Sequence, residues 1–164
     1  MSMSTSTAAG IVRQAGEGER RWFYGGGTHT WKVVAEETDG AFYVFEDCLS
    51  SGKMTPVHCH PGADELAYVL EGEILVRLGD REERVGAGGV MLAPRGVPHA
   101  FMVTSESARL LFFQTPGSSQ AFYRGASEPA TTDGDGPMDV ARVQAVANET
   151  GATQMLGPPP FQQP

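Results

Sequence analysis

The stretch GKMTPVHCHPGADELAYVLEG, from Gly52 to Gly72, decides the fold of this chain. In an extended strand, residues two apart project from the same face, so His58 and His60 can point at a common site. A turn at 61–64 then reverses the chain, and Glu65 opens the next strand, from which its side chain can return to that site. Two imidazoles and one carboxylate in this arrangement indicate a metal site, whereas the alternative is two independent surface histidines.

A second pattern downstream supplies a fourth possible ligand. Gly88, Pro94, Gly96 and His99 follow the spacing Gly-x5-Pro-x-Gly-x2-His, and His99 begins a separate strand that could close the far side of the site. Three imidazoles and one carboxylate suit one divalent Fe, Ni, Co, Mn, Cu or Zn ion better than Mg or Ca, which prefer oxygen ligands. The ligand types do not identify which of these metals is bound. Four protein ligands would leave an octahedral ion two positions for water, dioxygen or substrate.

The composition indicates a mostly β protein. A chain of 164 residues fits one compact domain, and its 21 Gly and 11 Pro separate short runs of β-forming residues. We expect strands near 22–24, 31–35, 42–48, 65–70, 73–78, 90–93, 99–103 and 109–115, with a hairpin turn at 78–81 leading into 82–85. Many short strands at this spacing predict a sandwich or barrel.

Charge and patterning exclude several classes of function. Acidic residues outnumber basic ones by 20 to 12, so a nucleic acid partner would meet net repulsion. The N-terminus lacks the pattern of a signal peptide and no stretch is apolar enough to span a bilayer, so we expect a cytoplasmic protein without a membrane partner. Two cysteines are too few for a disulfide framework. Strand alternation points Cys59 away from the face of its neighbouring histidines, so we interpret it as a small buried hydrophobe.

The two ends of the chain differ from its centre in composition and in the periodicity of apolar residues. We predict a flexible N-terminal arm over 1–20, a β-barrel over 21–125, and a linker, a short helix and a Pro-rich tail over 126–164. The helix is indicated by Pro137 in a first turn and by apolar residues at helical spacing from Val140 to Ala147. Gly151 stands where a glycine would end it.

Two further polar residues have simpler interpretations than metal ligation. His29 lies in the segment Gly-Gly-Gly-Thr-His-Thr and belongs to no ligand pattern, so we interpret it as a solvated loop histidine. Asp64 is interpreted as a turn residue rather than a second carboxylate ligand.

The two patterns together resemble those of the cupin superfamily. The first motif is matched by Gly52, His58, His60, Glu65 and Gly72, and the second by Gly88, Pro94, Gly96 and His99. The second motif of the family ends in Asn, where this chain has Val103, a change that removes a polar group from the pocket wall. The resemblance implies a single-domain jelly-roll barrel, or double-stranded β-helix, from about Trp22 to Thr115, with a short C-terminal helix.

A narrower likeness concerns the reaction. The Trp22–Phe23 entry, the run Pro-Arg-Gly-Val-Pro-His-Ala-Phe and the later Phe-Tyr-Arg segment resemble small bacterial quercetin 2,3-dioxygenase-like cupins. This resemblance implies a metal-dependent dioxygenase that opens a flavonol-like or other enolisable aromatic substrate with O2. Glu65 would act as a ligand and as the general base for the enol proton. An apolar slot would hold the substrate, and we expect it to be lined by Phe42, Tyr68, Phe101, Val103 and Phe113.

Other functions remain compatible with the same residues. One is a non-oxidative cupin enzyme, such as a polyketide cyclase or an isomerase, in which the metal acts only as a Lewis acid. Another is a metal-bearing small-molecule binding protein without turnover, and a third is a structural zinc site. A barrel with many short strands has edges to protect, so we also expect a homodimer.

Overall fold

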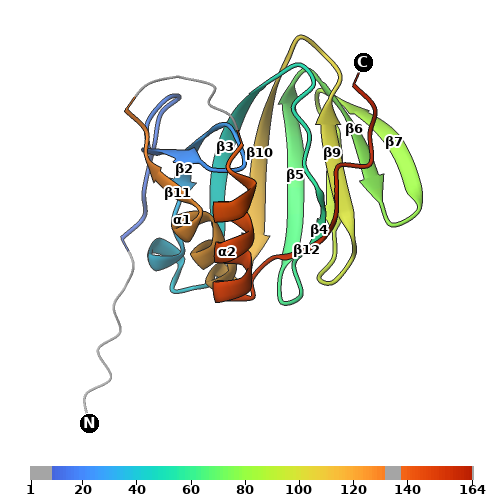
Figure 1. Ribbon diagram of the computed structural model, residues 1–164. Helices are drawn as coiled ribbons and strands as arrows, with labels where there is room; N and C mark the ends of the chain where they lie inside the picture. The colour runs from blue at the N-terminus through green and yellow to red at the C-terminus, as the bar shows by residue number, and fades with distance from the viewer. Residues whose placement is uncertain (1–8, 132–137, 164) are drawn as a thin grey trace.

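Two antiparallel sheets form the body of the protein in the computed structural model, which describes residues 9–131 and 138–163 (Figure 1). The first sheet has the strand order β11-β1-β2-β3-β10-β5-β8 and the second the order β12-β4-β9-β6-β7. The first sheet comprises β1 (Glu19–Phe23), β2 (Thr28–Val33), β3 (Tyr43–Ser50), β5 (Asp64–Glu71), β8 (Val90–Ala93), β10 (Ser107–Thr115) and β11 (Ser127–Pro129). The second comprises β4 (Val57–Cys59), β6 (Glu73–Leu78), β7 (Arg81–Gly86), β9 (His99–Val103) and β12 (Gln154–Gly157). The mostly β jelly-roll predicted from the sequence is confirmed.

Alternation along the strands builds the core between the sheets. In β3 and β10 every second side chain is buried, and these buried residues pack against those of β6 and β9 from the opposite sheet. All five residues of β9 are buried, because this strand lies between β4 and β6 and also contributes to the site described below. The core is therefore shared by both sheets.

A glycine permits the chain to pass from the first sheet to the second. Gly72 lies between β5 and β6 with φ of 82°, a conformation that side-chain-bearing residues rarely adopt. A Cβ atom at this position would stand 2.2 Å from the backbone oxygen of Ser107. Both conformation and space demand glycine, which explains its place at the end of the first motif.

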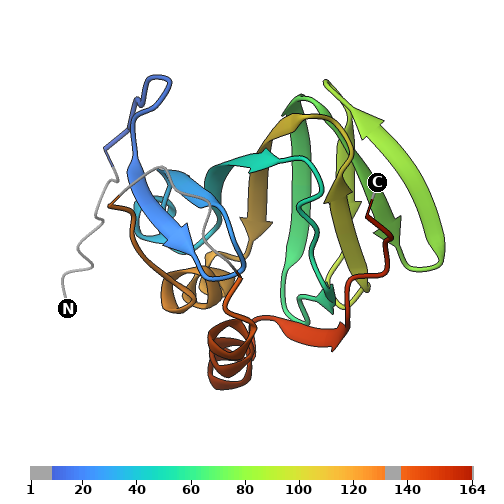
Figure 2. The same ribbon diagram turned by 45° about the horizontal axis from the view of Figure 1, so that its top comes forward.

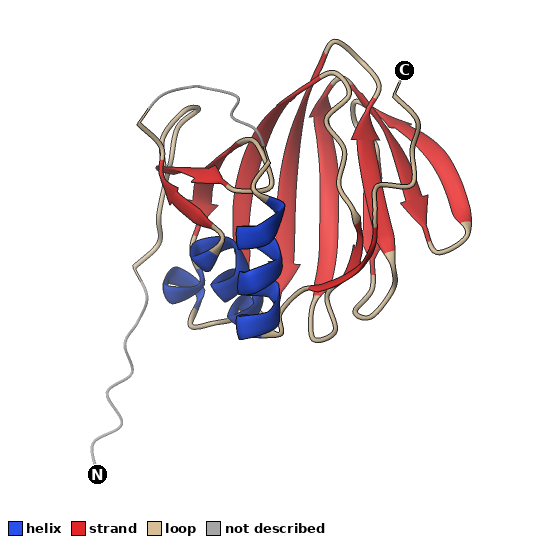
Figure 3. Cartoon of the chain, viewed as in Figure 1, coloured by secondary structure: helices blue, strands red, loops and turns tan. Residues whose placement is uncertain are grey.

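The helical segments gather at one side of the molecule (Figure 3). They are the 3-10 turns η1 (Ala35–Thr38) and η2 (Gly117–Ser119) and the helices α1 (Gln120–Gly125) and α2 (Val140–Thr150). Helix α2 confirms the predicted C-terminal helix: Asp139 accepts a hydrogen bond from the amide of Arg142, and Gly151 ends the helix with φ of 65°. The predicted place of Pro137 in the first turn lies outside the described residues.

Two short strands were not predicted. Strand β11 lies in the segment interpreted as a linker and pairs with β1, whereas β12 follows α2 and pairs with β4. Both are edge strands of their sheets. In Figure 2, α2 and β12 lie on the same side of the molecule, and β12 runs antiparallel beside β4.

The N-terminal segment preceding β1 is docked over its described part. The Arg13 guanidinium donates to the Glu37 carboxylate at 2.9 and 2.5 Å and to the Lys32 carbonyl at 2.6 Å. Strand β1 begins at Glu19, within the predicted arm. Within 9–131 and 138–163, no helix is long and apolar enough to cross a membrane.

Candidate metal centre

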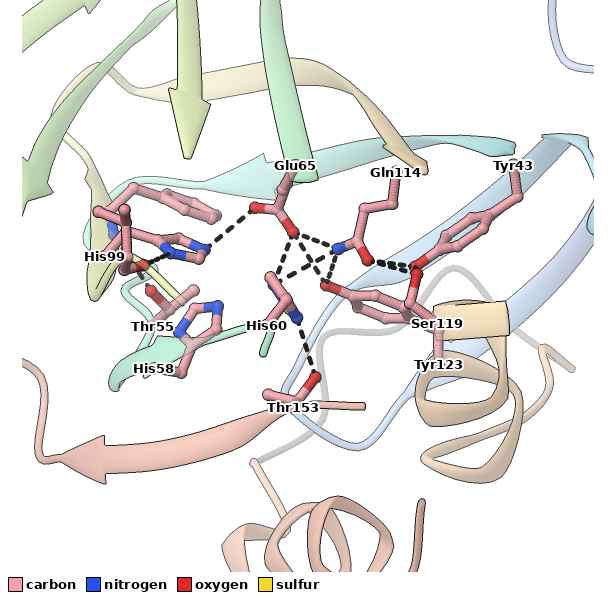
Figure 4. A network of polar contacts seen from close by, with 12 residues as sticks. Tyr43, Thr55, His58, His60, Glu65, His99, Gln114, Ser119, Tyr123 and Thr153 are labelled. Carbon is pink, nitrogen blue, oxygen red and sulfur yellow. Dashed lines mark hydrogen bonds and ion pairs between the residues drawn. The ribbon is translucent and has the colours of Figure 1, made fainter. Parts of the chain in front are cut away.

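Neighbouring strands bring three histidines together. His58 on β4 is the Cα partner of His99 on β9, and His60 follows directly after β4. One nitrogen from each of these rings lies within 4.8 Å of the others, so the three residues could hold a metal ion. Glu65, from the start of β5, points into the same cluster (Figure 4).

The outer ring nitrogens are held by fixed partners. His58 Nδ1 lies 2.8 Å from the carbonyl of Pro56, and His99 Nδ1 lies 3.0 Å from the carbonyl of Val97. Because a carbonyl only accepts, each Nδ1 donates, so in the neutral form of each ring the lone pair is on Nε2. His60 Nδ1 lies 3.1 Å from the Thr153 hydroxyl. Such contacts orient histidine rings in metal sites.

The inner atoms fit a transition metal. Glu65 Oε2 lies 2.9 Å from His60 Nε2, and Glu65 Oε1 lies 3.4 Å from His99 Nε2. His99 Nε2 is buried and has no hydrogen-bond partner among the described residues. A buried nitrogen lone pair beside a carboxylate and two more imidazoles is the donor set that divalent transition metals prefer.

Burial and neighbouring charges prepare these groups for coordination. Burial, together with repulsion from His99 and His60, lowers the pKa of His58 to about 3, so its imidazole is neutral at physiological pH. Burial acts to raise the pKa of Glu65, but His60 and His99 outweigh it and hold the pKa well below its usual value. Burial acts to lower the pKa of His99, whereas the Glu65 carboxylate, 3.4 Å from Nε2, and the Val97 carbonyl raise it on balance.

A buried polar network holds the Glu65 carboxylate from the side away from His99 (Figure 4). Gln114 on β10 donates from Nε2 to Glu65 Oε2, and its Oε1 accepts from Tyr43 at 2.6 Å and from Ser119 at 2.9 Å. The Tyr123 hydroxyl lies 3.5 Å from Glu65 Oε2. No sequence signal marked Gln114 or Tyr123 as part of the site, because neither belongs to a ligand pattern.

An apolar cavity of about 80 Å³ adjoins the cluster. His58 and Glu65 line it, together with aromatic residues from four strands and helix α1: Phe23, Phe45, Phe101, Phe112, Phe122 and Tyr123. Residues of the C-terminal segment, including Met138, Val143, Thr153 and Met155, line the remaining side.

The structure corrects four of the five predicted substrate contacts. Phe101 lines the cavity, but Phe42, Tyr68, Val103 and Phe113 do not. Phe113 is on the opposite face of β10 from Phe112, and its ring instead contacts Phe42 at 5.1 Å. Tyr68 is exposed on β5, and Val103 is wholly buried in the core away from the cavity.

The interpretation of His29 as a solvated loop residue is wrong. His29 lies on β2, is only 2% exposed and lines the cavity. The three glycines before it form the turn, and the strand begins earlier than the sequence indicated. Asp64 is the first residue of β5 rather than a turn residue, and its carboxylate binds Arg95 at the surface. Cys59 is buried and carries no disulfide, as expected.

These features define a class of protein: a double-sheet β-barrel with a three-histidine, one-carboxylate centre that opens into an aromatic cavity. Residues 45–113 match the cupin domain family. The chain belongs to the cupin superfamily.

Known proteins with related sequences or structures include a dioxygenase, an oxidase and a cyclase. A quercetin 2,3-dioxygenase of Bacillus subtilis (strain 168) is 25% identical over 122 residues, which cover 74% of this chain and 36% of that protein. Oxalate oxidase GF-3.8 of Triticum aestivum is 30% identical over 142 residues, with 79% of this chain and 57% of that protein covered. The chain thus spans 36% and 57% of the length of these two relatives. The polyketide cyclase RemF of Streptomyces resistomycificus has a TM-score of 0.55 and 27% identity, with 65% of this chain and 79% of that chain covered.

Proposed function

We propose that this cupin is a metal-dependent dioxygenase acting on a flavonol-like or other enolisable aromatic compound. The observation that carries the proposal is the placement of Glu65 among three histidines at the edge of an aromatic cavity. The similarity to the Bacillus quercetin 2,3-dioxygenase supports this reaction class.

His58, His60, His99 and Glu65 would hold the ion. A divalent transition metal bound there supplies a Lewis acid that lowers the pKa of an enol and a redox centre for O2 chemistry. The ionised Glu65 carboxylate is positioned to accept the proton of a substrate hydroxyl, so that an O–H bond breaks at the substrate and one forms at Glu65. Gln114 and Tyr123 keep that carboxylate in place.

The size of the cavity limits how a substrate enters. A volume of about 80 Å³ is smaller than the roughly 150 Å³ in which a single benzene ring is bound in an engineered cavity. The lining includes Met54, Met138 and Met155, whose unbranched side chains adapt readily to new shapes. We therefore expect an aromatic substrate to enter by displacing these methionines rather than the rigid aromatic wall.

A second candidate function is a cyclase or isomerase that uses the metal only as a Lewis acid. The similarity to RemF favours it. The same Glu65 would then move a proton between two positions of one substrate, and no O2 would be consumed.

Oxygen uptake tests the proposal. The metal-free protein would be reconstituted anaerobically with Fe, Ni, Co or Mn, and O2 consumption measured with flavonols and polyketide-like enols. Uptake in proportion to substrate loss is expected for at least one metal. The protein reconstituted with each metal but given no substrate serves as the control. Substrate loss without uptake would support the cyclase or isomerase, and the absence of both would reject enzymatic turnover of these compounds.

A further inference from the structure

The cavity has a second polar cluster that the metal centre does not use. His29 on β2 and Asp47 on β3 are Cα partners, and His29 Nε2 lies 3.2 Å from Asp47 Oδ1. The residues are 2% and 5% exposed, and both line the cavity that contains Glu65. A charged side chain is rarely this buried unless it is paired, and the pair here lies at the wall of a cavity.

The His29 ring is fixed in orientation. It stacks between Phe23, at a centroid distance of 4.8 Å, and Phe45, at 4.3 Å. Tyr123 lies between the two polar clusters: its ring is 5.6 Å from that of His29, and its hydroxyl is 3.5 Å from Glu65 Oε2. The His29–Asp47 pair therefore lies in the same cavity as the metal centre, on the other side of Tyr123.

The pair is not satisfied by the protein. His29 Nδ1 is buried and has no hydrogen-bond partner in the part of the chain that the structure describes. Asp47 Oδ1 likewise has no hydrogen-bond partner among those residues, so its 3.2 Å contact with His29 Nε2 is an electrostatic one. The negative charge of Asp47 favours the tautomer with the proton on Nε2, which leaves Nδ1 as an acceptor. An unpaired buried acceptor costs roughly 1–3 kcal/mol, so a pair whose only role was to support the fold would be expected to have all of its polar atoms matched.

We propose that His29, oriented by Asp47, accepts a hydrogen bond from a hydroxyl group of an aromatic ligand whose opposite end lies at the three-histidine centre. This inference rests on the proposed function for the position of that opposite end. The rings of Phe45 and Phe112, 5.2 Å apart, form an apolar wall between two polar ends. A ligand with one metal-binding oxygen and one distant hydroxyl matches this arrangement, and His29 would select for the hydroxyl.

Two related probes test the inference. The affinities of 3-hydroxyflavone and 3,4′-dihydroxyflavone would be measured by titration against the full chain loaded with zinc, which is redox-inert and so separates binding from turnover. We expect the wild type to bind the dihydroxy compound about tenfold more tightly, because one satisfied buried acceptor distinguishes the two. In His29→Phe, which preserves the ring stack, the two affinities should become equal. Phe42→Leu, outside the cavity, should keep the preference.

A second pair of variants covers the case in which His29→Phe does not fold. His29→Asn keeps an acceptor near the position of Nδ1 and should retain part of the preference, whereas Asp47→Asn removes the charge that fixes the tautomer and should weaken it. Equal affinities in the wild type, or no binding of either probe, would overturn the inference. Retained preference in His29→Phe would also overturn it. A tenfold preference without O2 uptake by any reconstituted metal form would reject the proposed dioxygenase and leave the role of His29 standing.

Discussion

The two carboxylate oxygens of Glu65 have different neighbours. Oε1 faces His99, whereas Oε2 contacts His60 and receives the Gln114 amide. In Glu65→Gln the side chain keeps its size but cannot take up a proton. We expect turnover to fall at least about 100-fold, because general-base catalysis contributes that much. Metal content, measured by elemental analysis, should fall far less, since three histidines remain.

Glu71→Gln is the matched control, because Glu71 lies on the same strand but is exposed and binds Arg109 at the surface. It should leave both turnover and metal content unchanged. Unchanged turnover in Glu65→Gln would contradict a role for Glu65 as a base.

Gln114 is the residue on which the buried network depends. In Gln114→Leu, Glu65 loses a donor, and the hydroxyls of Tyr43 and Ser119 lose their shared acceptor. We expect a loss of about 2–4 kcal/mol in the free energy of unfolding of the metal-free protein, measured by urea denaturation, since several buried groups are left unpaired. Ser119→Ala removes one donor only and should cost about 1 kcal/mol. Equal losses in the two variants would show that Gln114 is not central.

The pKa of His99 predicts how metal affinity depends on pH. Glu65 raises this pKa above 6.5 in the metal-free protein, so an incoming ion must displace a proton from His99. Below that raised pKa, zinc affinity should fall by at least about tenfold for each unit of decreasing pH, because one proton is exchanged per ion. His58 adds nothing in this range, since it gains its proton only near pH 3. Competition with a chelator at pH 7.5, 6.5 and 5.5 would measure the slope, and an affinity independent of pH would contradict the prediction.

The ligand candidates could be predicted from the sequence because local rules place them. Alternation along one strand and a tight turn suffice to bring His58, His60 and Glu65 to one side. Gln114 and His29 were missed for the opposite reason. Gln114 meets Glu65 only because β10 pairs with β5, and His29 enters the cavity only because β2 pairs with β3, and such long-range pairings leave no local pattern.

At the scale of elements, the C-terminal segment completes the metal centre. Thr153, between α2 and β12, contacts His60 Nδ1, and β12 pairs with the strand that carries His58. Thr153→Val keeps the shape but removes this contact. We expect metal affinity to fall about tenfold, because the hydrogen-bond partners of ligating histidines typically contribute about 10–100-fold. Chelator competition would measure it.

Thr150→Val provides the control, since the Thr150 hydroxyl donates to the Val146 carbonyl and accepts from the Ala152 amide rather than contacting a histidine. An effect of equal size in both variants would indicate a general loosening of the segment rather than a contact to His60.

The elements that could be predicted differ from those that could not in length and location. Strands β6, β8 and β9 match the predicted bounds because each is a run of β-forming residues that turn residues delimit. Strands β11 and β12 have three and four residues and contain Pro or Gly. They exist only because a neighbouring edge is available, so propensity alone could not reveal them.

At the scale of the whole molecule, one sheet edge has an apolar surface. Val90 and Leu92 on the edge strand β8 are 52% and 53% exposed, and Tyr68, the Cα partner of Val90 on β5, is 39% exposed. Exposed apolar side chains beside an unpaired strand edge favour association with another chain. We therefore expect that two copies pair through this edge in solution, the homodimer predicted from the sequence.

Light scattering after size exclusion should give about twice the mass of one chain for the wild type. Leu92→Lys should give the mass of one chain, because it places a charge in the centre of the contact. Val140→Lys, equally exposed on α2, should remain dimeric. A monomeric wild type would contradict the homodimer, and a dimeric Leu92→Lys would place the interface elsewhere.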